Sequence, residues 1–154
     1  MPQIQGINRN QLQLLSLNEL VAEDHPVRAI EAFVDYLDLE ELGFVEKGKI
    51  KEGRPAYPRK VLLKLYVYGY LNRLRSSRQL ERACQRNIEL WWLLEQQTPG
   101  YKTIANFRKD HPQALRQVFL QFNLLCRDWN LFEGKTVAID GSKFRAQNSK
   151  KRNF

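Results

Sequence analysis

Three prolines, each standing before a stretch of regularly spaced apolar residues, restrict the fold of this chain more than any other feature. Pro26, Pro58 and Pro112 each precede apolar residues that recur at intervals of three and four. Proline suits the first turn of an α-helix, where the amide that it lacks would have no partner, and it disrupts a helix or a sheet at interior positions. The spacing predicts an amphipathic helix after each proline. We therefore expect a mainly α-helical fold.

The first and last of these helices have clear sequence boundaries. Asp24 can cap the first helix, and Gly43 can end it. The last helix, within residues 111–132, has the most regular apolar periodicity and is expected to be the central pillar of the core. His25 and His111 each precede a proline at a helix start, and neither has a companion at metal-ligand spacing, so we interpret both as structural.

The middle helix, residues 58–73, is expected to pack tightly along one side. Lys60 and Lys64 are predicted to project away from its apolar stripe. Gly69 lies in its interior, where glycine costs about 1 kcal/mol relative to alanine, so a neighbouring helix is expected to approach closely there. Three tyrosines at alternate positions point to different faces, which favours packing over stacking on nucleic-acid bases: Tyr66, Tyr68 and Tyr70.

A periodic arginine stripe follows. Ser76 and Gln79 match a capping box, which predicts that a helix begins there. Arg78, Arg82 and Arg86 repeat every four residues and so share one face of that helix. Like charges at this spacing destabilise a helix, and phosphate groups are the simplest external compensation. A solvated basic face is the alternative.

A second short helix is expected after Thr103, which can cap it. Lys102, Asn106 and Lys109 would cluster on its outer side. A short helix, a turn and another short helix with polar groups outward is the outline of a helix-turn-helix reader of DNA. Asn106 can pair bidentately with adenine in the major groove, although the sequence alone favours an ordinary surface asparagine at this position.

Charge and composition narrow the class of partner. The net charge is +8, and residues 53–86 hold nine lysines and arginines against one acidic residue. Local basic excess is typical of proteins that bind polyanions. No apolar run approaches a membrane span, and no secretory signal is visible, so we expect a cytoplasmic protein without membrane contact. Cys84 and Cys126 are far apart in the sequence, which favours two buried side chains over a zinc site or a disulfide.

Near the C-terminus, the stretch VAIDGSKFRA predicts a strand followed by a tight turn. Residues 136–139 are β-branched or apolar, and Gly141 permits the turn. Such a strand would hold the carboxylate of Asp140 rigidly at its end. An Asp-Gly pair between strand residues is also the common two-residue hairpin loop, so a simple hairpin explains the same residues.

Several blocks of the sequence resemble the N-terminal part of the DDE transposases of bacterial insertion sequences, in the branch with an InsH-type transposase N-terminal domain. The blocks are GRPAYPRKVLLKLYVYGYLNRLRSSRQLERACQRNIELWWLL, TPGYKTIANFRKDHP and VAIDGSKFRAQNS, and LNELVAEDHPVRAIEAFVDYLDLEELGF resembles the opening of the family. The resemblance implies a multi-helix DNA-binding domain with helix-turn-helix-like elements over residues 1–133. It implies the first strand or hairpin of an RNase H-like catalytic domain over residues 134–154, with a disordered basic tail.

The resemblance also implies a catalytic and metal-ligating role for Asp140, as the first of three acidic ligands of Mg²⁺ or Mn²⁺. Two-metal cleavage of phosphodiesters needs several carboxylates, because the two hard cations take oxygen ligands. No acidic residue follows Asp140 in the sequence. We therefore expect the chain to be truncated after this aspartate, to hold no metal stably and to be catalytically incomplete by itself.

DNA binding is the activity that the chain is expected to keep. The expected partners are double-stranded DNA, in particular the terminal inverted repeats of an insertion sequence, and a second copy or a full-length transposase. The alternatives are a regulator or inhibitor of the full-length enzyme and an inert helical remnant; an RNA binder is disfavoured because no RNA-recognition pattern appears. The residues expected to contact DNA are Arg54, Lys60, Lys64, Arg75, Arg78, Arg82, Arg86, Lys102, Asn106, Lys109, Lys143 and Arg145.

Overall fold

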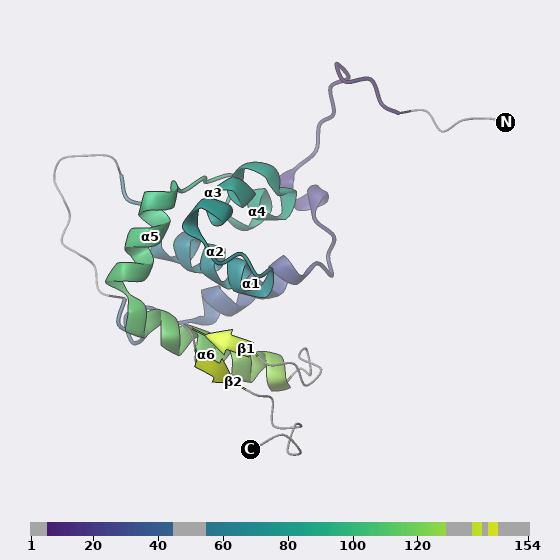
Figure 1. The fold of residues 1–154 in the computed structure, drawn as a ribbon. Helices are drawn as coiled ribbons and strands as arrows, with labels where there is room; N and C mark the ends of the chain where they lie inside the picture. Colours follow the sequence, from purple (N-terminus) through teal and green to yellow (C-terminus); the bar gives the residue numbers. More distant parts are fainter. Residues whose placement is uncertain (1–5, 45–54, 129–136, 140–141, 145–154) are drawn as a thin grey trace.

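The computed structural model describes residues 6–44, 55–128, 137–139 and 142–144 of the chain (Figure 1). In these residues the fold is mainly helical, as the sequence predicts. The elements, in chain order, are the 3-10 helix η1 (Leu17–Leu20), the α-helices α1 (Pro26–Tyr36), α2 (Arg59–Leu71), α3 (Ser77–Arg86), α4 (Ile88–Leu93), α5 (Tyr101–Asp110) and α6 (Pro112–Asp128), and the strands β1 (Val137–Ile139) and β2 (Ser142–Phe144).

Helix α2 is the centre of the core. Leu63, Leu65 and Val67 are completely buried, although they lie on different sides of this helix. The other helices surround α2 because an element that is apolar on nearly every side needs neighbours all round. The prediction that the last helix is the central pillar is therefore wrong. Helix α6 buries one stripe, which includes Val118 and Phe122, and keeps an exposed polar side.

Helix α1 begins at Pro26, as predicted, but its cap and its end differ from the prediction. The residue that caps α1 is His25, whose Nδ1 accepts a hydrogen bond from the amide of Val27 at 3.2 Å. The predicted cap, Asp24, is exposed. The helix ends at Tyr36, and the chain then turns through Gly43, which has a φ of +87°. Glycine serves there as a turn residue beyond the helix, because its conformation is one that residues with a Cβ atom rarely adopt.

The close approach predicted at Gly69 is confirmed. A Cβ atom built on Gly69 would lie 2.6 Å from Cδ2 of Leu80 and 3.1 Å from the carbonyl oxygen of Leu74. Leu80 belongs to α3, so the missing side chain lets α3 pack directly on α2. This contact positions the arginine-bearing helix relative to the core.

The three tyrosines of α2 pack as expected. The Tyr66 hydroxyl donates a hydrogen bond to the Ile104 carbonyl oxygen at 2.5 Å. The Tyr68 hydroxyl donates to Glu89 Oε1 at 2.6 Å, and the Tyr70 hydroxyl donates to Asn123 Oδ1 at 3.1 Å. Burial raises the pKa of Tyr66 to about 12. The hydroxyl groups therefore stay protonated and hold α4, α5 and α6 against α2.

One arginine fastens the N-terminal segment to the helices. The guanidinium of Arg28 donates to the carbonyl oxygens of Asn18, Val21 and Ala22 at 3.1, 2.8 and 2.9 Å and to Asn18 Oδ1 at 3.0 Å. It also lies over the ring of Trp92, 4.7 Å from the centroid. Arg28 thereby joins η1, α1 and α4.

The remaining predictions about the fold concern the cysteines and the C-terminal strands. Cys84 and Cys126 are buried free thiols, as predicted, and burial raises their pKa values to about 12 and about 11. The backbones of β1 and β2 pair antiparallel, with Ile139 opposite Ser142. Asp140 and Gly141, between the strands, lie outside the described residues. None of the helices in the described ranges has the length and hydropathy of a membrane span.

Candidate nucleic-acid interface

Helix α5 is held in the fold by its inner face. Ile104 is completely buried and Phe107 is nearly so. The ring of Phe107 stacks near Phe44 and Tyr66, with centroid distances of 5.7 and 5.9 Å. The helix begins at Tyr101 with Gly100 as its N-cap, so the prediction that Thr103 caps it is wrong. Thr103 lies inside the first turn because the helix starts two residues earlier.

The outer face of α5 carries the polar residues that the periodicity predicted. Lys102, Asn106 and Lys109 are all exposed. They share one side of the helix, since residues three and four apart lie above one another. This side is free to meet a partner without any rearrangement of the core.

Helix α3 begins where the capping box predicts. The backbone amide of Gln79 donates a hydrogen bond to Ser76 Oγ at 3.1 Å, and the side-chain oxygen Oε1 of Gln79 accepts one from the backbone amide of Ser76 at 3.2 Å. Leu80, Ala83 and Cys84 are buried, which leaves the arginine stripe exposed on the opposite side.

A hollow of about 350 Å³ lies where α3 meets α5. The guanidinium of Arg78 lies over the Tyr101 ring at 5.0 Å from the centroid, so this arginine has a partner inside the chain. In the part of the chain that the structure describes, no carboxylate pairs with Arg82 or Arg86. Their charges face the hollow, in which Glu81 is the one acidic group among the lining residues Arg78, Glu81, Arg82, Gln85, Arg86 and Tyr101.

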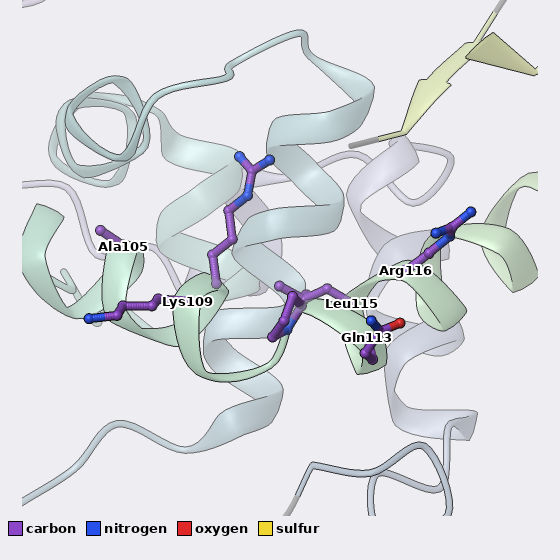
Figure 2. A pocket seen from close by; sticks show the side chains of 7 residues that line it. Ala105, Lys109, Gln113, Leu115 and Arg116 are labelled. Carbon is purple, nitrogen blue, oxygen red and sulfur yellow. The ribbon is translucent and has the colours of Figure 1, made fainter. Parts of the chain in front are cut away.

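A second hollow, of about 500 Å³, lies at the junction of α5 and α6. Figure 2 shows Lys109 of α5 and Arg116 of α6 on its two sides, with Leu115 between them. Its lining residues include three cations and no carboxylate: Ala105, Arg108, Lys109, Pro112, Gln113, Leu115 and Arg116. The two hollows together give this part of the surface a strongly positive character.

The two lysines of α2 lie elsewhere and have partners. Lys64 is only 8% exposed, and its Nζ lies 3.2 Å from Glu31 Oε1 and 3.5 Å from Asp35 Oδ1. Lys60 Nζ lies 3.7 Å from the same Asp35 oxygen. Lys64 was expected to project on another side of the helix than the apolar stripe, but that side is not open to solvent, because Lys64 pairs with the acidic side chains of α1 in the contact between α1 and α2.

The other predicted residues divide into exposed and undescribed ones. Arg75 is exposed just before α3. Arg54, Asp140, Arg145 and the side chain of Lys143 lie outside the described residues. The described residues hold no cluster of three or more His, Cys, Asp or Glu side chains that would suit a metal ion.

A comparison with protein families identifies the chain. A family model described as Transposase domain (DUF772) matches residues 15–110, which run from just before η1 to the end of α5. The chain belongs to this transposase domain family. The match includes the arginine stripe of α3 and the polar face of α5. No curated protein and no solved structure matches the chain significantly.

Two residues of this surface were not among the predicted contacts. Tyr101 lies beside Arg78 of the arginine stripe, and Arg116 is exposed beside the second hollow. The sequence spacing could have placed each of them near the predicted surface. Tyr101 and Arg108 are seven residues apart on one side of α5, and Arg116 lies one turn after the proline that opens α6.

Proposed function

We propose that this chain is the DNA-binding part of a transposase and that α3 and α5 form its DNA-binding surface. One observation carries the proposal: the arginine stripe of α3 and the polar face of α5 are both exposed, and Arg82 and Arg86 line a hollow that Tyr101, the first residue of α5, also lines. Membership in the transposase domain family supports it.

The two helices have different parts in this proposal. Arg82 and Arg86 contact phosphates, which fix the register of a protein on duplex DNA without reading its sequence. Asn106 is exposed in the middle of α5 and is the candidate for reading a base edge, since asparagine can bond adenine through two atoms. The recognised DNA is the terminal repeat of an insertion sequence, and α5 acts in the manner of a helix-turn-helix reading helix.

Binding of a mixed-sequence duplex, measured by fluorescence anisotropy at several salt concentrations, tests the surface. Arg82→Gln should weaken binding about fivefold at 0.15 M salt and reduce the salt slope by about 1, because one phosphate contact releases roughly 0.9 counterions. Arg127→Gln is the matched control, since Arg127 is exposed near the end of α6 and pairs with Asp128 at 3.3 Å. Equal effects of the two substitutions, or none, would contradict the proposed surface.

Catalysis belongs to the proposal only through the family resemblance. Asp140 is proposed as one carboxylate that would help to hold Mg²⁺ or Mn²⁺, ions that would supply charge stabilisation for the attacking and leaving oxygens of a phosphodiester. One carboxylate does not suffice for two metal ions, so the 154-residue chain by itself is expected not to cut DNA. Cutting in the presence of either metal that Asp140→Ala abolishes would overturn this expectation.

A further inference from the structure

The two basic hollows lie along one flank of α5. Tyr101 lines the hollow beside α3, whereas Ala105 and Arg108 line the hollow beside α6. Residues at positions i, i+4 and i+7 share one side of a helix, so these three side chains form a single row. The row starts at the arginines of α3 and ends at the first turns of α6.

The length of this row suits the backbone of a nucleic-acid strand. Tyr101 and Arg108 are seven residues apart, which corresponds to roughly 10 Å along the helix axis. One strand of a duplex rises about 3.4 Å along the duplex axis per phosphate, and adjacent phosphates are farther apart than this along the winding backbone, so a row of this length can meet about two phosphates. Both ends of the row are cationic, with Arg82 and Arg86 at one end and Arg116 at the other.

Arg116 is suited to a contact with phosphate. Its side chain is exposed at the rim of the second hollow, and no carboxylate of the described residues pairs with it. Lys109 lines the opposite side of the hollow, so α5 and α6 both place a cationic residue at it; Figure 2 shows the ends of the Lys109 and Arg116 side chains directed away from each other. A guanidinium also offers two parallel donors to a phosphate, which fixes its orientation.

We propose that the phosphate backbone of a single DNA strand runs along this flank of α5, from the arginines of α3 to Arg116 of α6. The inference rests on the proposed function and extends the DNA-binding surface beyond the helices that the sequence singles out. It assigns to Arg116 a phosphate contact on a third helix, outside the region that the family model matches.

Arg116→Gln tests the path against Arg127→Gln as a matched control. The two arginines lie on nearly the same side of α6, because eleven residues make about three whole turns, and they are separated by about 16 Å along the helix axis. Both substitutions remove one positive charge and keep a long side chain. Arg116→Gln is expected to weaken binding of the duplex about fivefold at 0.15 M salt and to lower the salt slope by about 1, whereas Arg127→Gln leaves both unchanged.

The outcomes separate this inference from the proposed function. If Arg82→Gln weakens binding but Arg116→Gln behaves like the unsubstituted chain, the path along α5 is wrong and the surface on α3 stands. If neither substitution weakens binding, both proposals fail. If Arg116→Gln and Arg127→Gln weaken binding equally, net charge explains the effect and the path is again wrong. Equal thermal unfolding of the two α6 variants checks that each remains folded.

Discussion

Single residues hold the fold together through contacts that sequence patterns do not show. Arg28 belongs to α1, yet it donates hydrogen bonds to Asn18, Val21 and Ala22 and lies over Trp92. Nothing in the spacing of Arg28 distinguishes it from a surface arginine, because its partners are loop carbonyls and a ring from distant parts of the chain. Such a contact depends on the tertiary fold, which periodicity does not encode.

Gly69 is the opposite case, since its role was visible in the sequence. Gly69→Ala should lower the free energy of unfolding by on the order of 1 kcal/mol, because the overpacking cost of about 1 to 3 kcal/mol exceeds the gain of about 1 kcal/mol in helix propensity. The added methyl group would meet Leu80 and the Leu74 carbonyl. Urea unfolding monitored by circular dichroism measures the change.

A double-substitution cycle provides the control for this prediction. Leu80→Ala removes the side chain that the new methyl group would strike, so Gly69→Ala should cost less in the Leu80→Ala background than in the unsubstituted chain. An equal cost in both backgrounds would show that the contact with Leu80 does not limit the residue at position 69.

At the scale of helices, their existence and their apolar faces were predictable, but some boundaries and their places in the core were not. The capping box at Ser76 is a local signal, and the structure confirms it. The caps of α1 and α5 were misassigned because His25 and Gly100 are weaker signals than the neighbouring Asp24 and Thr103. The central place of α2 in the core was missed, because a helix that is buried on most sides shows little contrast between its faces in the sequence.

Because Ser76 caps α3 but Thr103 does not cap α5, replacing each of them by alanine should change the free energy of unfolding by different amounts. Ser76→Ala should reduce the free energy of unfolding by about 1 kcal/mol, because the Gln79 amide loses its hydrogen bond to the serine hydroxyl. Thr103→Ala is the comparison, since Thr103 lies within α5 and makes no cap, and alanine favours the helix interior. Urea unfolding of both variants measures the difference. A loss at position 103 as large as that at position 76 would contradict the assigned start of α5.

At the scale of the molecule, the basic residues that the structure describes include two kinds that the sequence could not separate. Lys64 and Arg82 look alike in the sequence, because each lies in a basic block of a helix. In the structure Lys64 pairs with Glu31 and Asp35, which lie about thirty positions earlier in the chain, whereas Arg82 faces a hollow. The sequence therefore predicted a polyanion-binding surface but could not tell which basic residues are exposed and which are paired inside the fold. The second hollow depends on the junction of α5 with α6, which local patterns do not specify.

This division predicts opposite effects for two substitutions that remove the same charge. Lys64→Gln should lower the free energy of unfolding by on the order of 1 to 2 kcal/mol, because Glu31 and Asp35 lose a partner that is largely buried. Its affinity for duplex DNA should stay unchanged at temperatures where the chain is folded. Arg82→Gln should leave the stability nearly unchanged and weaken DNA binding, because its side chain is exposed. Urea unfolding and fluorescence anisotropy on the same preparations measure both quantities. If Lys64→Gln weakens binding of the folded chain as much as Arg82→Gln does, net charge rather than the surface of α3 and α5 attracts the DNA.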